Sequence, residues 1–325
     1  MIPAPEAQQR LHPEIAERVV RLGAAAGKPA HLQTPAEVRA AFLAARQPPR
    51  RPVAGLLIED MAIAAPAGHS IALRRYSPTG CEPMAAFAYF HGGGFTNGDL
   101  DSHDAIACAI ALQGRLHVVS VDYRVLPAHP FPAAFDDAVA VLRWLPAWAE
   151  SLGIGERHIA AGGDSSGANL ALAATLALLD ETALQALWLA YPIIGADFET
   201  ASYRENAHAP LLTRARCQRI LADYLGRPIE PGDWRVAPLL SPELHRLPPL
   251  VTIAAELDPL RSDAEILLAR LSPLQAQRSR LVPAPGMPHG FLRWIGDSAA
   301  CARILRESID RLSERVGAGL RRTGS

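Results

Sequence analysis

This chain of 325 residues has almost no net charge and almost no lysine. The formal net charge is −1 at pH 7, which argues against nucleic acid as a partner, because nucleic-acid-binding proteins usually present a strongly basic face. Lys28 is the only lysine, so arginine supplies nearly every positive charge. We interpret this bias as genomic composition and assign it no binding role.

The chain has few cysteines, and they lie far apart, at Cys81, Cys108, Cys217 and Cys301. None of them forms a C-x-x-C pair, so the sequence indicates neither a zinc site nor a redox pair, and we expect no metal. Reduced, partly buried thiols are typical of cytoplasmic proteins. We therefore expect a cytoplasmic protein.

Long apolar runs and targeting signals are missing as well. The start of the chain, M-I-P-A-P-E-A-Q-Q-R, contains no apolar segment of the kind found in a signal peptide. The longest apolar stretch, residues 168–194, is interrupted by Asp180 and Glu181, so we expect no membrane span. Hydrophobic residues nevertheless make up 49% of the chain, which indicates a globular protein with a large core.

Predicted strands and helices alternate along most of the sequence. Apolar runs at 56–63 and 71–76 flank a Pro-Ala-Gly turn and predict an antiparallel hairpin at a sheet edge. Further strands are predicted at 85–90, 116–121, 186–191, 250–255 and 279–283, and helices at 102–113, 134–150, 263–271 and 299–316. This alternation predicts an α/β fold, with a largely parallel sheet and helices on both faces.

Residues 196–236 interrupt this alternation. They show helical spacing around 213–225 and no convincing strand. A long insertion at the carboxyl edge of a parallel sheet can cover the site there, so we predict a lid. Two helices are also predicted ahead of the sheet, one around residues 11–22 and a second that starts at Pro35.

The pattern G-x-S-x-G at residues 163–167 stands between an apolar strand and an Ala/Leu-rich helix. This context is typical of a nucleophile elbow, a sharp turn that exposes a serine hydroxyl. The serine of such a turn has a strained backbone and close neighbours, so Gly163 and Gly167 would provide the necessary space. We predict that Ser165 is a nucleophile at the positive end of the following helix.

An acyl-transfer serine also needs a general base and an acid that orients this base. We predict His289 as the base, because it lies in a loop after the last predicted strand and beside a glycine. Asp258 follows the preceding strand and is the predicted acid, with Asp263 and Glu256 as competitors. Asp263 fits a helix-capping role better, and Glu256 lies almost inside the strand. Because parallel strands end at one edge of a sheet, these side chains can meet.

Three consecutive glycines, Gly92-Gly93-Gly94, follow the strand at 85–90. Without side chains, their backbone N–H groups can approach a substrate oxygen closely and stabilise its developing negative charge. We predict that the N–H groups of Gly93, Gly94 and Ser166 form this oxyanion hole. A flexible glycine loop is the alternative interpretation.

Together these motifs resemble the hormone-sensitive-lipase-like family of α/β-hydrolases, bacterial esterases with an H-G-G-G motif. The stretches that carry the resemblance are H-G-G-G-F-T-N-G-D-L at 91–100, D-Y-R-V-L-P-A-H-P-F-P-A-A at 122–134, G-D-S-S-G-A-N-L at 163–170, L-D-P-L-R-S-D at 257–263 and H-G-F at 289–291. The chain order of serine, acid and histidine is also the order associated with this fold.

The resemblance implies an α/β-hydrolase fold with eight strands and a helical cap. The cap would consist of residues 1–50 and 196–236, and the catalytic domain of residues 51–195 and 237–325. The implied activity is hydrolysis of short- to medium-chain carboxylic esters, small-molecule substrates, without a cofactor. The resemblance leaves a homodimer open, because relatives often pair through an edge strand or the last helix.

The resemblance also assigns supporting roles. His91 and Gly92 would hold the glycine loop rather than act on the substrate. Ser166 is a departure, because most relatives have alanine after the nucleophile. Its backbone N–H keeps the oxyanion role, whereas its hydroxyl adds a polar group of unassigned purpose beside the site.

Apolar residues are candidates for the substrate pocket, namely Phe95, Phe198, Leu211 and Leu212. The alternative is that they form the core of the cap, the commoner place for apolar residues at such spacing. An amidase or deacetylase would use the same triad. The fold also supports a non-catalytic receptor or an interaction module, because a fold does not determine a function.

Overall fold

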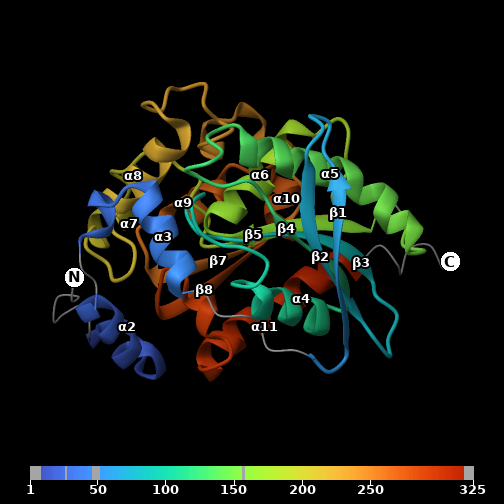
Figure 1. The fold of residues 1–325 in the computed structure, drawn as a ribbon, viewed down its shortest axis with the longest axis horizontal. Helices are drawn as coiled ribbons and strands as arrows, with labels where there is room; N and C mark the ends of the chain where they lie inside the picture. Colours follow the sequence, from blue (N-terminus) through green and yellow to red (C-terminus); the bar gives the residue numbers. More distant parts are fainter. Residues whose placement is uncertain (1–8, 26–27, 46–51, 156–157, 318–325) are drawn as a thin grey trace.

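The computed structural model describes residues 9–25, 28–45, 52–155 and 158–317. A single sheet of eight strands runs through the molecule in the order β1-β2-β4-β3-β5-β6-β7-β8 (Figure 1). β1 pairs antiparallel with β2, and β2 pairs antiparallel with β4. All other neighbours pair in parallel. The predicted mostly parallel sheet with a hairpin at its edge is therefore confirmed.

The strands match the predicted apolar runs closely, except that β8 ends five residues later than predicted, at Pro288 instead of 283. Their bounds are β1 Leu56–Ala64, β2 Ser70–Pro78, β3 Ala85–Phe90, β4 Leu116–Asp122, β5 Ile159–Asp164, β6 Ala186–Ala190, β7 Leu250–Leu257 and β8 Arg280–Pro288. Every residue of β3, β5 and β6 is buried. This burial explains their continuous apolar sequences, because a central strand of a parallel sheet is covered on both faces.

Helices connect the strands and flank the sheet. Their bounds are α2 Pro13–Ala25, η1 Ala30–Leu32, α3 Pro35–Ala45, α4 Asp104–Gly114, α5 Ala133–Ser151, α6 Ser166–Ala177, α7 Ala201–Glu205, α8 Arg214–Leu225, η2 Pro238–Leu240, η3 Pro242–Arg246, α9 Arg261–Ala269, α10 Pro273–Arg278, η4 Phe291–Trp294 and α11 Ala299–Gly317. The sequence analysis missed the short helix α10, although Ser272 caps its first turn and Pro273 begins it.

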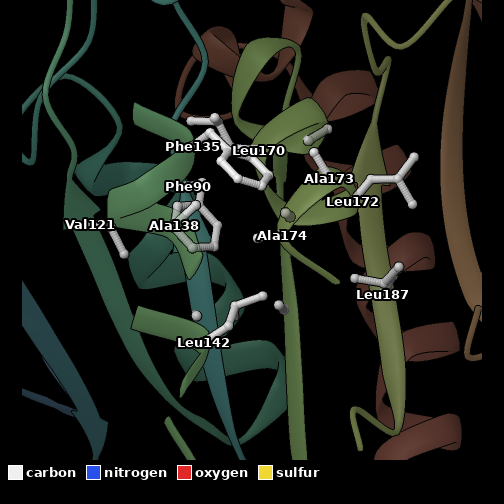
Figure 2. Packing of buried hydrophobic residues seen from close by; sticks show 14 of the residues in the cluster. Phe90, Val121, Phe135, Ala138, Leu142, Leu170, Leu172, Ala173, Ala174 and Leu187 are labelled. Atoms are coloured by element: carbon white, nitrogen blue, oxygen red, sulfur yellow. The ribbon is translucent and has the colours of Figure 1, made fainter. Parts of the chain in front are cut away.

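Two apolar layers lie on opposite faces of the sheet. α5, α6 and α9 cover one face, where Phe135 and Leu170 pack near Phe90 of β3 (Figure 2). α4 and α11 cover the other face, where Phe87 of β3 packs. Successive β3 side chains thus enter different layers, as a strand period of two requires. Each buried aromatic side chain contributes about 1.5–3 kcal/mol by removing apolar surface from water.

The insertion at 196–236 contains the helices α7 and α8 and lies beside the N-terminal segment (Figure 1). α8 contacts η1. Its Tyr224 ring stacks on Phe95, which follows β3, with ring centres 3.8 Å apart, and also contacts Phe131. The insertion therefore packs over the glycine loop. The division of the chain into a cap and a catalytic domain stays a prediction.

The segment around α2 is bonded to the far edge of the sheet. Arg10 forms an ion pair with Glu256 of β7 at 3.0 Å, and the N–H of His12 donates to the carbonyl of Gly286 in β8 at 2.9 Å. The Glu14 carboxylate accepts hydrogen bonds from the beginning of α11. These contacts join the start of the chain to the two strands that precede the predicted acid and base.

Candidate active site

β5 ends in a sharp turn that carries Ser165. The φ angle of Ser165 is +54°, a conformation that residues other than glycine rarely adopt and that costs about 1–3 kcal/mol. A Cβ atom on Gly163 would lie 2.2 Å from the carbonyl oxygen of Phe90, and one on Gly167 only 1.9 Å from it. Both positions therefore require glycine. α6 begins at Ser166, so the Ser165 side chain lies at a helix N-terminus.

Three predicted site residues meet at the carboxyl edge of the sheet. The Oγ atom of Ser165 lies 2.8 Å from Nε2 of His289. Nδ1 of the same ring lies 2.7 Å from Oδ2 of Asp258, which is fully buried. Asp258 and His289 directly follow the last residues of β7 and β8. With a carboxylate at Nδ1, this nitrogen carries the ring proton, and Nε2 is left as the acceptor that faces the serine.

The competing carboxylates have other partners. Asp263 accepts hydrogen bonds from the N–H groups of Gly195 at 2.8 Å and Ile194 at 3.2 Å, so the expected role as a helix cap is wrong, and Asp263 instead binds the loop after β6. Burial raises the pKa of Asp263 to about 7, although these two donors oppose this effect. Glu256 accepts a hydrogen bond from the Gly286 N–H and pairs with an arginine.

His91 lies under the glycine loop. Its ring is buried and stacks on Tyr123 with ring centres 4.3 Å apart, and its Nδ1 lies 2.9 Å from the carbonyl oxygen of Gly92. Burial lowers the pKa of His91 to about 3, so the ring is neutral. A Cβ atom on Gly98 would lie 2.1 Å from Nδ1. The sequence analysis did not identify this close approach of Gly98.

Asp164, which precedes the predicted nucleophile, is a further buried residue that the sequence analysis missed. Its Oδ1 accepts hydrogen bonds from the Tyr89 hydroxyl at 2.7 Å and from the Gly92 N–H at 2.8 Å. Burial would raise the pKa of Asp164, but nearby His103 and these donors lower it to about 2. The carboxylate is therefore charged and joins the glycine loop to the elbow. Its position next to Ser165 in G-D-S-S-G is the sequence feature that could have identified it.

The glycine loop presents backbone amides beside Ser165. Gly93 and Gly94 have φ angles of +131° and +64°, which glycine adopts without strain. Among the described residues, the N–H groups of Gly93 and Ser166 have no protein acceptor. The N–H of Gly94 differs, because it donates to the Ser166 hydroxyl at 2.9 Å.

A cavity of about 410 Å³ lies over Ser165. Its apolar walls come from several elements and include Phe42, Ile106, Leu211, Leu212, Ile220 and Leu292. Phe95 and Phe198, also predicted to line the substrate pocket, do not line this cavity, and a contact with the substrate stays a prediction for both. Phe95 is buried against Tyr224, and Phe198 packs on Tyr203. Phe95 fills the contact between the glycine loop and the insertion, and Phe198 packs within the insertion against the core. These are the core positions that the sequence analysis gave as the alternative.

The described residues contain neither a candidate metal site nor a membrane-spanning helix. No three or more His, Cys, Asp or Glu side chains converge there in a way that could hold a metal ion. All four cysteines are free thiols, and three of them are buried. None of the helices described is long and apolar enough to cross a bilayer.

Comparisons with known proteins agree with this architecture. Residues 87–293 match a family model described as an alpha/beta hydrolase fold. The chain is 35% identical over 267 residues to carboxylesterase NlhH of Mycobacterium tuberculosis, covering 79% of this chain and 82% of that protein. It is 34% identical over 242 residues to an ethyl acetate hydrolase of Pseudomonas putida, covering 73% and 76%. A hyperthermophilic esterase from Pyrobaculum calidifontis superimposes with a TM-score of 0.77 at 27% identity, covering 98% and 99%.

Proposed function

Because the chain belongs to the hormone-sensitive-lipase-like family of α/β-hydrolases and is a carboxylic ester hydrolase, we propose that it cleaves short- to medium-chain esters through an acyl-enzyme on Ser165. The observation that carries this proposal is the pair of short contacts from Ser165 to His289 and from His289 to Asp258. A nucleophile, a base and an orienting acid in this order are the parts that acyl transfer needs.

The proposed reaction has two steps. His289 Nε2 accepts the hydroxyl proton while Ser165 Oγ forms a bond to the ester carbonyl carbon. The amides of the glycine loop and of Ser166 stabilise the oxyanion. The carbon–oxygen bond to the alcohol then breaks, and the alcohol leaves with the proton from His289. Water repeats the sequence on the acyl-enzyme and releases the acid, while Asp258 stabilises the charged imidazole in both steps.

The cavity supports small esters as substrates. Its volume of about 410 Å³ falls in the range of small-ligand pockets. Aliphatic residues line part of its wall, beside polar and charged residues such as Asn97, Arg216 and Arg293. Leu211 and Leu212 are proposed to contact the acyl chain. We assign them with Phe42 to a cap of residues 1–50 and 196–236, over a catalytic domain of 51–195 and 237–325. A homodimer and a cytoplasmic location stay predictions from the sequence.

Replacing the nucleophile tests the proposal. Ser165→Ala should lower kcat on p-nitrophenyl butyrate by at least about 1,000-fold and should abolish covalent labelling by a fluorophosphonate, detected as a mass increase. Ser313→Ala is the matched control, because this serine lies in α11 and bonds only the carbonyl of Gly114. It should keep full activity and labelling.

The outcomes separate the alternatives. Retention of more than a tenth of the wild-type kcat in Ser165→Ala, or a label on another residue, would contradict the assignment. The p-nitroanilide of the same acyl group tests the amidase alternative, because only the leaving group changes. A wild-type protein that neither turns over esters nor takes the label would be a receptor or an interaction module.

A further inference from the structure

The Ser166 hydroxyl occupies one of the amides that the proposed mechanism directs at the oxyanion. The N–H of Gly94 donates to Ser166 Oγ over 2.9 Å, and both residues are buried. We propose that Ser166 is a positioning residue whose hydroxyl competes with the substrate oxyanion for the Gly94 N–H and thereby limits the rate of ester cleavage. This inference rests on the proposed function, because it concerns the same reaction.

The orientation of the hydroxyl favours competition. Burial raises the pKa of Tyr123, and a hydrogen bond from the Ser166 hydroxyl opposes this effect. The Tyr123 hydroxyl donates its own proton to the carbonyl of His91 at 2.7 Å, which leaves its oxygen able to accept a proton from Ser166. Since the Gly94 N–H donates to Ser166 Oγ, the Ser166 oxygen presents a lone pair to Gly94. A hydroxyl in this orientation accepts the amide proton and offers none to an oxyanion.

The glycine loop is held in place without this hydrogen bond. The carbonyl oxygen of Gly93 accepts from the N–H of Asn97 at 2.9 Å, and that of Gly94 accepts from the Thr96 hydroxyl at 3.1 Å. The first glycine of the loop is bonded to the carboxylate at the end of β5. Removing the Ser166 hydroxyl should therefore free the Gly94 N–H and leave the loop where it is.

The competition acts on the transition state. While the carbonyl oxygen of the substrate is neutral, the Gly94 N–H can stay with Ser166. As this oxygen becomes negative, the N–H must leave Ser166 or be shared between two acceptors. Surrendering a neutral hydrogen bond corresponds to about a fivefold change in an equilibrium. Because the loss occurs only in the transition state, it lowers kcat and leaves KM unchanged.

A graded substitution series tests the inference. Ser166→Ala removes the acceptor and should raise kcat on p-nitrophenyl butyrate about fivefold at unchanged KM. Ser166→Cys offers a weaker acceptor and should raise kcat about twofold. Side-chain volume follows a different order, with serine between alanine and cysteine. If Ser166 had only a packing role, kcat would rise in one variant and fall in the other, or it would fall in both.

Inhibitor binding supplies a readout that does not depend on turnover. Phenylboronic acid forms a tetrahedral anionic adduct with a serine hydroxyl and should bind Ser166→Ala about fivefold more tightly than the wild type. Butyramide, whose carbonyl oxygen is neutral as in the ground state, should bind both equally. The inference would be overturned by a lower kcat in Ser166→Ala than in the wild type. It would also be overturned if kcat rose in one of the two variants and fell in the other. If the wild type lacks turnover that depends on Ser165, the proposed function fails as well. If that turnover is present but the series is flat, only the inference fails.

Discussion

The change Asp258→Asn tests the proposed acid by forcing the histidine into the wrong tautomer. Both carboxylate oxygens of Asp258 are in use, because Oδ2 faces His289 Nδ1 at 2.7 Å and Oδ1 accepts from the Leu260 N–H at 2.9 Å. Asparagine has a single acceptor oxygen. The Leu260 N–H needs an acceptor, so the asparagine oxygen should take the position of Oδ1. The amide NH₂ group then faces His289.

The expected loss of kcat in Asp258→Asn follows from these two contacts. Facing a donor, His289 Nδ1 becomes an acceptor, and the ring proton moves to Nε2, which lies 2.8 Å from Ser165 Oγ. The ring then cannot accept the serine proton. Turning the amide round leaves the buried Leu260 N–H unpaired, at a cost of about 1–3 kcal/mol, so at most about a sixth of the molecules are productive. With the charge lost too, we expect kcat to fall by about 10³- to 10⁴-fold.

The assay is steady-state hydrolysis of p-nitrophenyl butyrate, with thermal unfolding as a check on the fold. Asp263→Asn is the matched control, because Asp263 is also buried after β7 but bonds the amides of Ile194 and Gly195. It should keep kcat within about threefold. The reasoning is refuted if Asp258→Asn keeps more than a tenth of kcat. An equal loss in both variants would also refute it, because it would give Asp263 a share in catalysis.

Two further predictions concern stability. Burial raises the pKa of Asp263 from 3.8 to about 7, so its contribution to stability is full below about pH 4 and is lost as pH rises through about 7. The melting temperature of Asp263→Asn relative to the wild type should therefore increase between about pH 5 and pH 8, and a constant difference would contradict the pKa. Gly98→Ala should lower the free energy of unfolding in urea by about 2 kcal/mol or more, because a Cβ atom there would lie 2.1 Å from His91 Nδ1 at a φ of +93°. An unchanged unfolding midpoint would show that the ring moves freely.

The strands and the candidate triad could be predicted because each has a local signal. β3 and β5 are continuous apolar runs that end in glycine-rich turns. Such a pattern is typical of a buried strand in a parallel sheet. Ser165, Asp258 and His289 all directly follow a strand. Because parallel strands share one edge, knowing where the strands end was enough to bring these three side chains together.

The pocket could not be predicted in the same way, because the direction of a loop side chain depends on distant partners. Phe95 follows the glycine triplet, yet it is buried by Tyr224, which stands far along the chain in α8. Phe42 of α3 lines the cavity instead, and no local pattern connects it with Ser165. Asp164 shows the same limit, since its partner Tyr89 is known only once β3 lies next to β5.

The N-terminal segment has two attachments whose combination constrains how this enzyme can change. α3 contributes Phe42 to the cavity wall, while the residues around α2 are bonded to Glu256 and Gly286, close in the chain to the proposed acid and base. Exchanging this segment to obtain a new substrate range should therefore also disturb the strands that hold the proposed acid and base. We expect changes in selectivity and in turnover to be coupled in variants of this segment.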